Sequence, residues 1–150
     1  MENICRTDSD NQDFQNLVIL LDKDLQDRDG EEHSFYSQYN KTIHIRNVVL
    51  YYLDNDIIGC GAFKGFDDSK VEIKRMFVRP EFRGQGIGME ILNELEAWAK
   101  ELNFKSTILE TGKRQPEAIK LYQKAGYKII SNFGQYENVE NSVCMLKEIA

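Results

Sequence analysis

The chain has 150 residues, of which 41% are hydrophobic and 29% are charged. This length predicts a single globular domain over residues 1–150, which can bury a core without disulfide staples. The sequence contains no run of about eighteen apolar residues, so no membrane span is predicted. Its polar start lacks the regions of a signal peptide, so a cytoplasmic location is expected. The net charge of −6 argues against a duplex nucleic-acid binder, because such proteins need a basic surface to displace phosphate counterions.

The first predicted elements are a short edge strand over residues 3–7 and a helix. Apolar side chains recur at helical spacing from Phe14 to Leu25, and Asp13 stands before them as a candidate N-cap. The run Arg28-Asp29-Gly30 is typical of a turn. A second, shorter helix is predicted directly after it, over residues 31–40.

Three strands joined by turns are predicted next. Residues 47–53 are rich in Val and Tyr, and residues 57–66 follow the turn Asp54-Asn55-Asp56. Gly59 and Gly61 in the second strand indicate a bulge or the close approach of another element. A third strand covers residues 71–78, and Pro80 ends it.

The second half of the chain alternates helices and strands. An apolar stripe from Ile87 to Leu102 predicts a long helix, which Asn103 can end in the left-handed conformation. Residues 106–110 are typical of a short buried strand. A further helix opens at Gln115-Pro116 and closes at Gly126, and two strands follow over residues 127–131 and 143–148. The order β-α-α-β-β-β-α-β-α-β-β predicts a mixed α/β fold with an antiparallel meander at its centre.

Metal chemistry is not predicted. Cys5, Cys60 and Cys144 include no CxxC pair, which argues against a disulfide framework and against a thiolate metal site. The two histidines, His33 and His44, have neither the HxxxH spacing of a helical metal site nor a cysteine nearby.

The densest motif is RPEFRGQGIGMEIL, residues 79–92, where three glycines alternate at the start of the long helix. A helix start carries N–H groups without partners and the positive end of the helix dipole, so this loop fits a phosphate or pyrophosphate. Arg83 adds a charge-assisted donor beside it. The spacings GxxxxGK[ST] and GxGxxG are both absent. The alternative interpretation is that the loop is only a tight strand-to-helix turn, in which the glycines avoid steric clashes and bind no ligand.

The spacing Arg83-x-x-Gly86-x-Gly88 resembles the pyrophosphate loop of the GNAT superfamily, the acetyl-CoA-dependent N-acetyltransferases. A second block, ETGKRQPEAIKLYQKAGY at residues 110–127, is similar to the second conserved helix of that family, although Gln115 stands where Asn is common. The resemblance is specific over residues 57–127. It implies the GNAT fold, a mixed and mostly antiparallel sheet flanked by helices, with acetyl-CoA as co-substrate and no metal.

The resemblance also implies which residues hold acetyl-CoA. The strand before the loop would supply main-chain hydrogen bonds to the pantetheine arm, and one of its N–H groups could steady the thioester oxygen. The loop would hold the pyrophosphate. The predicted cofactor-binding residues are Met76, Phe77, Val78, Arg83, Gly84, Gln85, Gly86, Ile87, Gly88 and Gln115.

Tyr122 matches the tyrosine that acts as general acid in the family and protonates the departing CoA thiolate. A thiol pKa of about 8.5 and a phenol pKa of about 10 make full proton transfer uphill by about 2 kcal/mol, so a shared proton is the better description. The spacing alone allows another interpretation, because Tyr122 also completes an ordinary buried stripe with Ala118, Leu121 and Ala125.

Glu72 is the candidate base that takes a proton from the acceptor ammonium, through a water. In VEIKRMFV the alternation of a strand predicts that Glu72 and Lys74 share one face, and that Met76 and Val78 continue it. A salt bridge between Glu72 and Lys74 or Arg75 is an equally open interpretation.

We therefore predict an N-acetyltransferase that moves acetyl to a primary amine of a small molecule or amino acid by direct attack in a ternary complex. No cysteine lies in a motif that suggests an acetyl-enzyme. The alternatives are acetylation of protein lysines or N-termini, and a non-catalytic acyl-CoA sensor. Members of the family often dimerise, so a homodimer stays open. The acceptor pocket is expected from the first two helices and the last strands, with the candidates Arg28, Asp29, Tyr36, Tyr39 and Tyr136.

Overall fold

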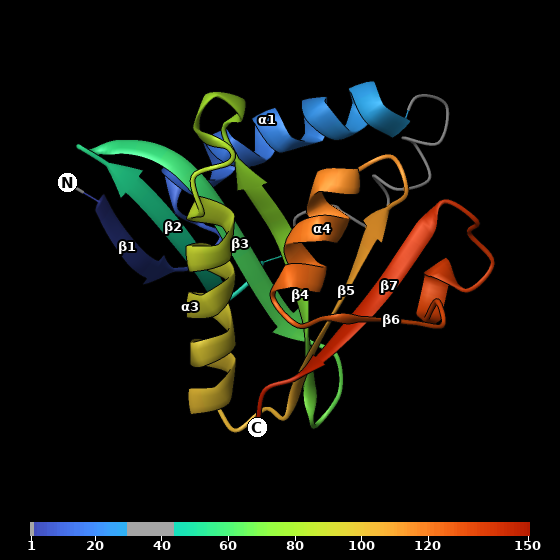
Figure 1. Ribbon diagram of the computed structural model, residues 1–150. Helices are drawn as coiled ribbons and strands as arrows, with labels where there is room; N and C mark the ends of the chain where they lie inside the picture. Colours follow the sequence, from blue (N-terminus) through green and yellow to red (C-terminus); the bar gives the residue numbers. More distant parts are fainter. Residues whose placement is uncertain (1, 30–43) are drawn as a thin grey trace.

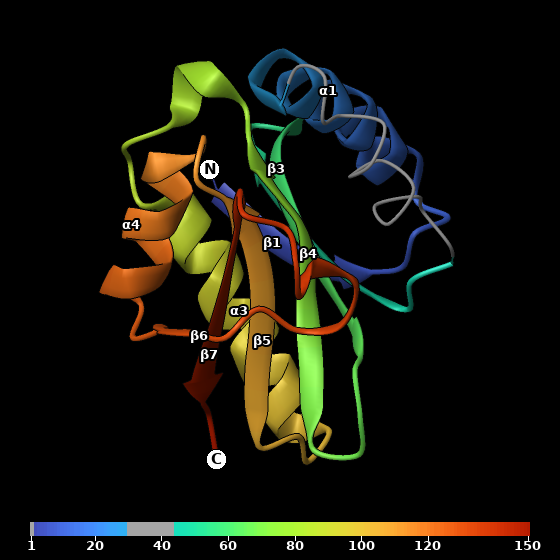
Figure 2. The same ribbon diagram turned by 90° about the vertical axis from the view of Figure 1, so that its right-hand side faces the viewer.

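The structure of the protein, a computed structural model, describes residues 2–29 and 44–150. A seven-stranded sheet carries helix α1 on one face and helices α3 and α4 on the other (Figure 1; Figure 2). The helices are α1 Gln12–Asp29, α3 Ile87–Glu101 and α4 Pro116–Lys124, with one-turn 3-10 helices at Pro80–Phe82 and Gly134–Tyr136. The strands are β1 Glu2–Thr7, β2 Asn47–Leu53, β3 Asp56–Gly65, β4 Lys70–Val78, β5 Ser106–Gly112, β6 Lys128–Ile130 and β7 Ser142–Glu148.

The mixed α/β fold and the predicted order of elements are confirmed within the described ranges. The helix predicted over residues 31–40 lies outside them. None of the helices in the described ranges has the length and apolar content that crossing a membrane requires.

The sheet opens between β4 and β5. Its strand order is β1-β2-β3-β4-β5-β7-β6, and the pairing of β4 with β5 is parallel whereas the other neighbours are antiparallel. This parallel pair is short, because it joins only Lys70–Glu72 to Ser106–Ile108. Each strand then continues without its neighbour, β4 to Val78 and β5 to Gly112. The C-terminal halves of these two strands therefore leave their facing edges open.

Glycines in β3 let α3 pack closely on the sheet. A Cβ atom added at Gly59 or Gly61 would lie 2.9 Å from a side-chain atom of Ile91 on α3. The β3–β4 register also shifts between Cys60 and Ala62. The predicted close approach is confirmed at both glycines, whereas the bulge opposite Gly61 has its extra residue on β4.

The bulge in β4 corrects the predicted alternation of that strand. Arg75 takes φ of 58°, a left-handed conformation, and is the extra residue where the register shifts. Residues before it alternate in one phase and residues after it in the other. Met76 and Val78 consequently pack in the core cluster under α3, with Ile73, and do not continue the face of Glu72 and Lys74. The prediction that they would was wrong.

The boundaries of α1 also differ from the prediction. Asn11 caps the helix, because its Oδ1 accepts a hydrogen bond from the Phe14 N–H at 3.1 Å, whereas the predicted cap Asp13 lies in the first turn. The helix runs to Asp29, so Arg28 and Asp29 are helical where a turn was predicted.

Several turns are as predicted. Asp54 and Asn55 take φ of 50° and 74°, so the β2–β3 hairpin uses two residue types that tolerate the left-handed region without the usual glycine. Asn103 after α3 and Gly126 after α4 also have positive φ, of 71° and 102°.

Candidate active site

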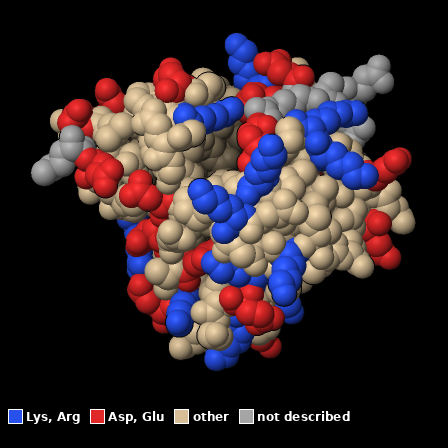
Figure 3. Space-filling model, viewed as in Figure 1, with Lys and Arg blue, Asp and Glu red and all other residues tan. Residues whose placement is uncertain are grey.

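A cavity of about 520 Å³ lies where β4 and β5 separate. It is bounded by β4, by the start of α3 with the loop before it, by α4 and by the C-terminal half of α1. Figure 3 shows a hollow in the upper half of this face of the molecule. The lining brings together most residues that the sequence predicted for the site: Glu72, Met76, Phe77, Val78, Arg83, Gly84, Gly86, Ile87, Gly88, Gln115, Tyr122 and Tyr136.

The glycine loop presents open backbone to this cavity. Gly84 and Gly86 have φ of 80° and 83°, and a Cβ atom added at either would meet nothing within 4 Å. Gly86 is the N-cap of α3, and its carbonyl accepts the first helical hydrogen bond from the Glu90 N–H at 3.1 Å. The N–H groups of the first helical turn therefore have no acceptor within the helix. The positive φ values require glycine for the backbone, and the open space leaves room for a ligand.

Arg83 has contacts on both sides of the loop. Its Nε donates to the Val78 carbonyl at 2.8 Å, and its Nη2 lies 3.6 Å from Asp24 Oδ2 of α1. The guanidinium also lies 5.4 Å from the centre of the Phe77 ring. These contacts fix the guanidinium at the edge of the cavity, with 31% of the side chain exposed.

Tyr122 reaches the cavity from α4. The side chain is 6% exposed, and its hydroxyl makes no hydrogen bond in the described part of the chain. Burial, and then the charge of Glu110, raise the pKa of the Tyr122 phenol. The group therefore stays protonated at neutral pH and can donate a hydrogen bond into the cavity.

Glu72 and Lys74 form a buried pair in the cavity wall. Lys74 Nζ lies 3.6 Å from Glu72 Oε2, and the two side chains are 9% and 5% exposed. Glu72 Oε2 is buried and has no hydrogen-bond donor among the described residues. Burial lowers the pKa of Lys74, and the charge of Glu72 opposes this shift. The alternative reading of Glu72 as a salt-bridge partner thus has a geometric basis.

Glu110 is a cavity residue that the sequence analysis did not single out. It lies two positions beyond Ile108, the β5 residue that pairs with Glu72, so both glutamates face the same side of the sheet. Its charge raises the pKa of Tyr122, and with Glu72 it adds to the effect of burial in raising the pKa of Tyr136. A carboxylate in an otherwise buried strand was the signal that could have identified it, as it did for Glu72.

Other predicted residues lie away from the cavity or outside the described ranges. Gln85 is exposed and does not line the cavity. His44 also lies outside it, with its Nδ1 3.3 Å from Ser9 Oγ. Across residues 2–29 and 44–150 no group of three or more His, Cys, Asp or Glu could hold a metal ion. Tyr36, Tyr39 and His33 lie outside the described residues, and the side chains of Arg28 and Asp29 are not described.

A second cluster of polar side chains lies beside Tyr122 and is closed to the cavity. The ring of Tyr127 packs edge-on against Tyr122, with centroids 5.7 Å apart. The Tyr127 hydroxyl donates to Glu96 Oε2 at 2.9 Å and lies 2.6 Å from Thr107 Oγ1. Lys147 Nζ donates to Glu96 Oε1 at 2.7 Å. We call these four residues the closed network.

Comparison with known protein families gives a match over most of the chain. The model described as the acetyltransferase (GNAT) family matches residues 14–127. Among individual relatives, an IAA acetyltransferase of Azospirillum brasilense is 38% identical over 81 residues, which are 53% of this chain and 53% of that protein. The chain thus spans about half the length of this relative.

Solved structures show the same architecture. A Klebsiella pneumoniae protein assigned as an acyl-CoA N-acyltransferase has a TM-score of 0.84 and 27% identity, and the match covers 100% of this chain and 99% of that one. A GNAT family acetyltransferase from Elizabethkingia anophelis with acetyl-CoA bound has a TM-score of 0.71 and 21% identity, over 98% and 97% of the two chains. The predicted fold class is confirmed.

Proposed function

Because the chain belongs to the acetyltransferase (GNAT) family, we propose that it transfers an acetyl group from acetyl-CoA to a primary amine of a small molecule or amino acid. The observation that carries this proposal is that one cavity joins the glycine loop, the open edge of β4, Tyr122 and Glu72. A phosphate site, a strand edge with free main-chain groups, an acid and a carboxylate are the parts that this reaction needs.

In the proposed binding mode, each part of acetyl-CoA has its own partner. The N–H groups at the start of α3 hold the pyrophosphate, where the helix dipole favours negative charge. The main chain of Met76, Phe77 and Val78 lies on the open edge of β4 and hydrogen-bonds the pantetheine arm. This arrangement directs the thioester towards Tyr122 and Glu72, which line the same cavity.

The proposed reaction is direct attack. The acceptor ammonium loses a proton to Glu72 through a water, and the amine nitrogen forms a bond to the thioester carbon. As the carbon–sulfur bond breaks, the Tyr122 hydroxyl donates a hydrogen bond to the leaving sulfur. Because the pKa of Tyr122 is raised, complete proton transfer to a thiolate is more uphill than for an ordinary phenol. Tyr122 therefore stabilises the thiolate chiefly through a shared proton, and the products are an amide and CoA.

The states of the cysteines support direct attack over an acetyl-enzyme. Burial raises the pKa of the Cys60 thiol to about 12 and that of the Cys144 thiol to about 11, so neither is a thiolate at neutral pH. All three cysteines are free thiols, which fits the proposed cytoplasmic location. A homodimer stays a prediction.

The test is release of free thiol from acetyl-CoA across a panel of amino acids, polyamines, aminoglycosides and short lysine peptides. Release well above the rate of hydrolysis with a small amine is the expected result, and it would name the acceptor class. Release with lysine peptides only would favour protein acetylation instead. Silence across the panel in protein that binds acetyl-CoA by calorimetry would favour the non-catalytic sensor.

A further inference from the structure

The segment that joins β6 to β7 contributes one residue, Tyr136, to the described lining of the cavity. Tyr136 ends the 3-10 helix Gly134–Tyr136, and its side chain is 1% exposed. Burial, and then the charges of Glu110 and Glu72, raise the pKa of the Tyr136 phenol. Tyr136 therefore lies near the two carboxylates of the cavity, although the proposed reaction gives it no part.

Hydrogen bonds within the segment fix its shape. The Tyr136 N–H donates to the Phe133 carbonyl at 3.0 Å, and the Val139 N–H donates to the Tyr136 carbonyl at 3.0 Å. The side-chain amide of Asn132 donates to the carbonyls of Val139 and Ser142, at 3.1 and 3.2 Å. The segment is therefore a compact unit, which a few side-chain contacts can hold in place.

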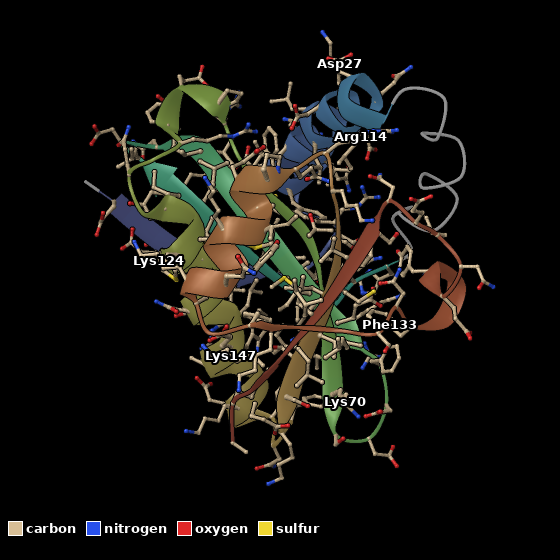
Figure 4. The ribbon with its side chains drawn as sticks, turned by 45° about the vertical axis from the view of Figure 1, so that its right-hand side comes forward. Asp27, Lys70, Arg114, Lys124, Phe133 and Lys147 are labelled. Carbon is tan, nitrogen blue, oxygen red and sulfur yellow. The ribbon has the colours of Figure 1, made fainter. Side chains whose placement is uncertain are left out.

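Three aromatic rings link this segment to the turn between β3 and β4. The rings of Phe133 and Tyr136 meet edge to face with centroids 5.8 Å apart, and those of Phe66 and Phe133 do so at 5.3 Å. Phe66 directly follows β3, and Figure 4 labels Phe133 on the side of the molecule where Lys70 begins β4. Edge-to-face pairs stabilise beyond the area that they bury. We call Phe66, Phe133 and Tyr136 the aromatic ladder.

The outer end of the aromatic ladder is anchored on a well-bonded turn. The Phe66 N–H donates to the Lys70 carbonyl at 2.9 Å, and Asp67 Oδ1 accepts from the N–H groups of Ser69 and Lys70, both at 2.8 Å. The Phe66 side chain is 45% exposed. A single exposed phenylalanine is ordinary in itself. This one, however, gives Phe133 a ring in a fixed position to pack against.

The inner end of the aromatic ladder is separate from the main core. Tyr136 and Cys144 form a small buried cluster, against which Phe133 packs. This cluster shares no residue with the two larger clusters, which pack the helices on the sheet. A change in the aromatic ladder should therefore move Tyr136 without loosening the glycine loop or the core under α3.

We propose that Phe66 and Phe133 are positioning residues, which set the selectivity for the acceptor amine by holding Tyr136 in the cavity wall. This inference rests on the proposed function, because it assumes that the amine binds beside Glu72. An aromatic ring close to two carboxylates suits an ammonium group, which both attract. A displaced Tyr136 would change the space for the amine, whereas the groups that hold acetyl-CoA lie on β4 and at the start of α3.

The experiment compares the wild type with Phe66→Ala, Phe66→Tyr and a control, Leu102→Ala. Phe66→Tyr keeps the ring that contacts Phe133. The control also removes an apolar side chain from an exposed site, because Leu102 is 48% exposed, and it does not line the cavity. Thiol release at saturating acetyl-CoA gives kcat and the KM of each accepted amine. Titration calorimetry gives acetyl-CoA affinity, and hydrogen exchange reports on the backbone of residues 131–141.

Phe66→Ala should raise the KM of the preferred amine by about three- to tenfold, the scale of one lost aromatic pair. It should leave kcat and acetyl-CoA affinity within about twofold, a split that general destabilisation would not give. Hydrogen exchange in residues 131–141 should become faster in this variant only. Phe66→Tyr and Leu102→Ala should match the wild type in every measurement.

The outcomes separate this inference from the proposed function. An unchanged amine KM in Phe66→Ala, or an equal loss of acetyl-CoA affinity, would overturn the role of the aromatic ladder and leave the proposed function intact. Unchanged hydrogen exchange in Phe66→Ala would overturn the positioning itself. A wild type that transfers acetyl to no amine of the panel would overturn the proposed function and the selectivity together.

Discussion

Two neighbouring clusters of this protein both combine Tyr, Glu and Lys side chains. One is the closed network around Tyr127, and the other lines the cavity around Tyr122. In the closed network, Glu96 accepts hydrogen bonds from Tyr127 and Lys147 at 2.9 and 2.7 Å. In the cavity, Tyr122 makes no hydrogen bond with a described residue, and the ion pair of Glu72 with Lys74 is long, at 3.6 Å. Buried polar groups with short, complete hydrogen bonds stabilise a fold, whereas those with unused capacity are suited to bind a ligand.

Sequence spacing does not separate these two clusters. Tyr122 and Tyr127 are both buried, their rings are in contact, and both lie in the block that resembles the family. The distinction arises from what each hydroxyl faces, a carboxylate in one case and a cavity in the other. Substitution of Tyr122 should therefore lower turnover, whereas substitutions in the closed network should lower stability.

The largest expected effect is that of Tyr122→Phe on turnover. Loss of the hydroxyl removes the donor to the leaving sulfur, so kcat should fall by about 10²–10³-fold. Acetyl-CoA affinity should change less than twofold, because the reacting end supplies little of the binding. Thiol release and titration calorimetry measure the two quantities. An equal loss of both would remove Tyr122 from its proposed role.

The second largest expected effect is on acetyl-CoA binding, in a comparison of two glycines with positive φ. Gly86→Leu and Gly134→Leu both place a side chain at a positive φ with nothing within 4 Å, but only Gly86 lies in the cavity. Both variants should lose about 1–2 kcal/mol of unfolding free energy from the strained conformation. Only Gly86→Leu should weaken acetyl-CoA binding, by more than about tenfold, because its side chain fills the space in front of the α3 N–H groups. Similar binding by the two variants would show that the loop does not hold the pyrophosphate.

A third effect concerns the charge on the cavity floor. Glu72→Gln removes one of the two carboxylates, the other being Glu110, whose charges offset the burial of Lys74, and should cost about 1–3 kcal/mol of stability at pH 7. Burial already holds the pKa of Lys74 below its ordinary value of 10.5, and the substitution lowers it further. The unfolded chain then binds more protons between the lowered pKa and 10.5, so the stability of the variant should rise with pH in that window. Urea unfolding at pH 7 and pH 10 measures this.

The double variant Glu72→Gln/Lys74→Met separates the two interpretations of Glu72. It removes both charges, so its stability should return towards that of the wild type. If Glu72 is the base, thiol release should stay low in spite of this recovery. A recovery of turnover together with stability would instead make Glu72 a salt-bridge partner only.

The smallest effect on turnover is expected in the closed network. Tyr127→Phe keeps the ring against Tyr122 but leaves Glu96 and Thr107 without the hydroxyl, which should cost about 1–3 kcal/mol of unfolding free energy. Turnover should stay within about twofold at a temperature where the variant is folded. A loss of kcat similar to that of Tyr122→Phe would mean that the two clusters act as one.

Much of this arrangement could be predicted from the sequence, because glycine, proline and periodicity mark local structure directly. The strands on either side of Asp54-Asn55, the α3 stripe and the loop at Gly86 have such signals. The choice of Asn11 over Asp13 as cap does not, because both residue types cap helices equally well. Glu110 was missed because its position in the site depends on the pairing of β5 with β4, which joins residues distant in the chain.

The phase change in β4 had no signal at all, since an arginine in the left-handed conformation has no sequence signature. It also has a consequence for how the site can evolve. Glu72 and Lys74, before Arg75, line the cavity from one face of β4, and the alternation starts afresh for Met76 and Val78 after it. Under the proposed function, substitutions at Lys74 should therefore change the amine end of the cavity without altering the packing of Met76 and Val78. Because of the single bulge at Arg75, side chains in the two halves of β4 can be substituted independently.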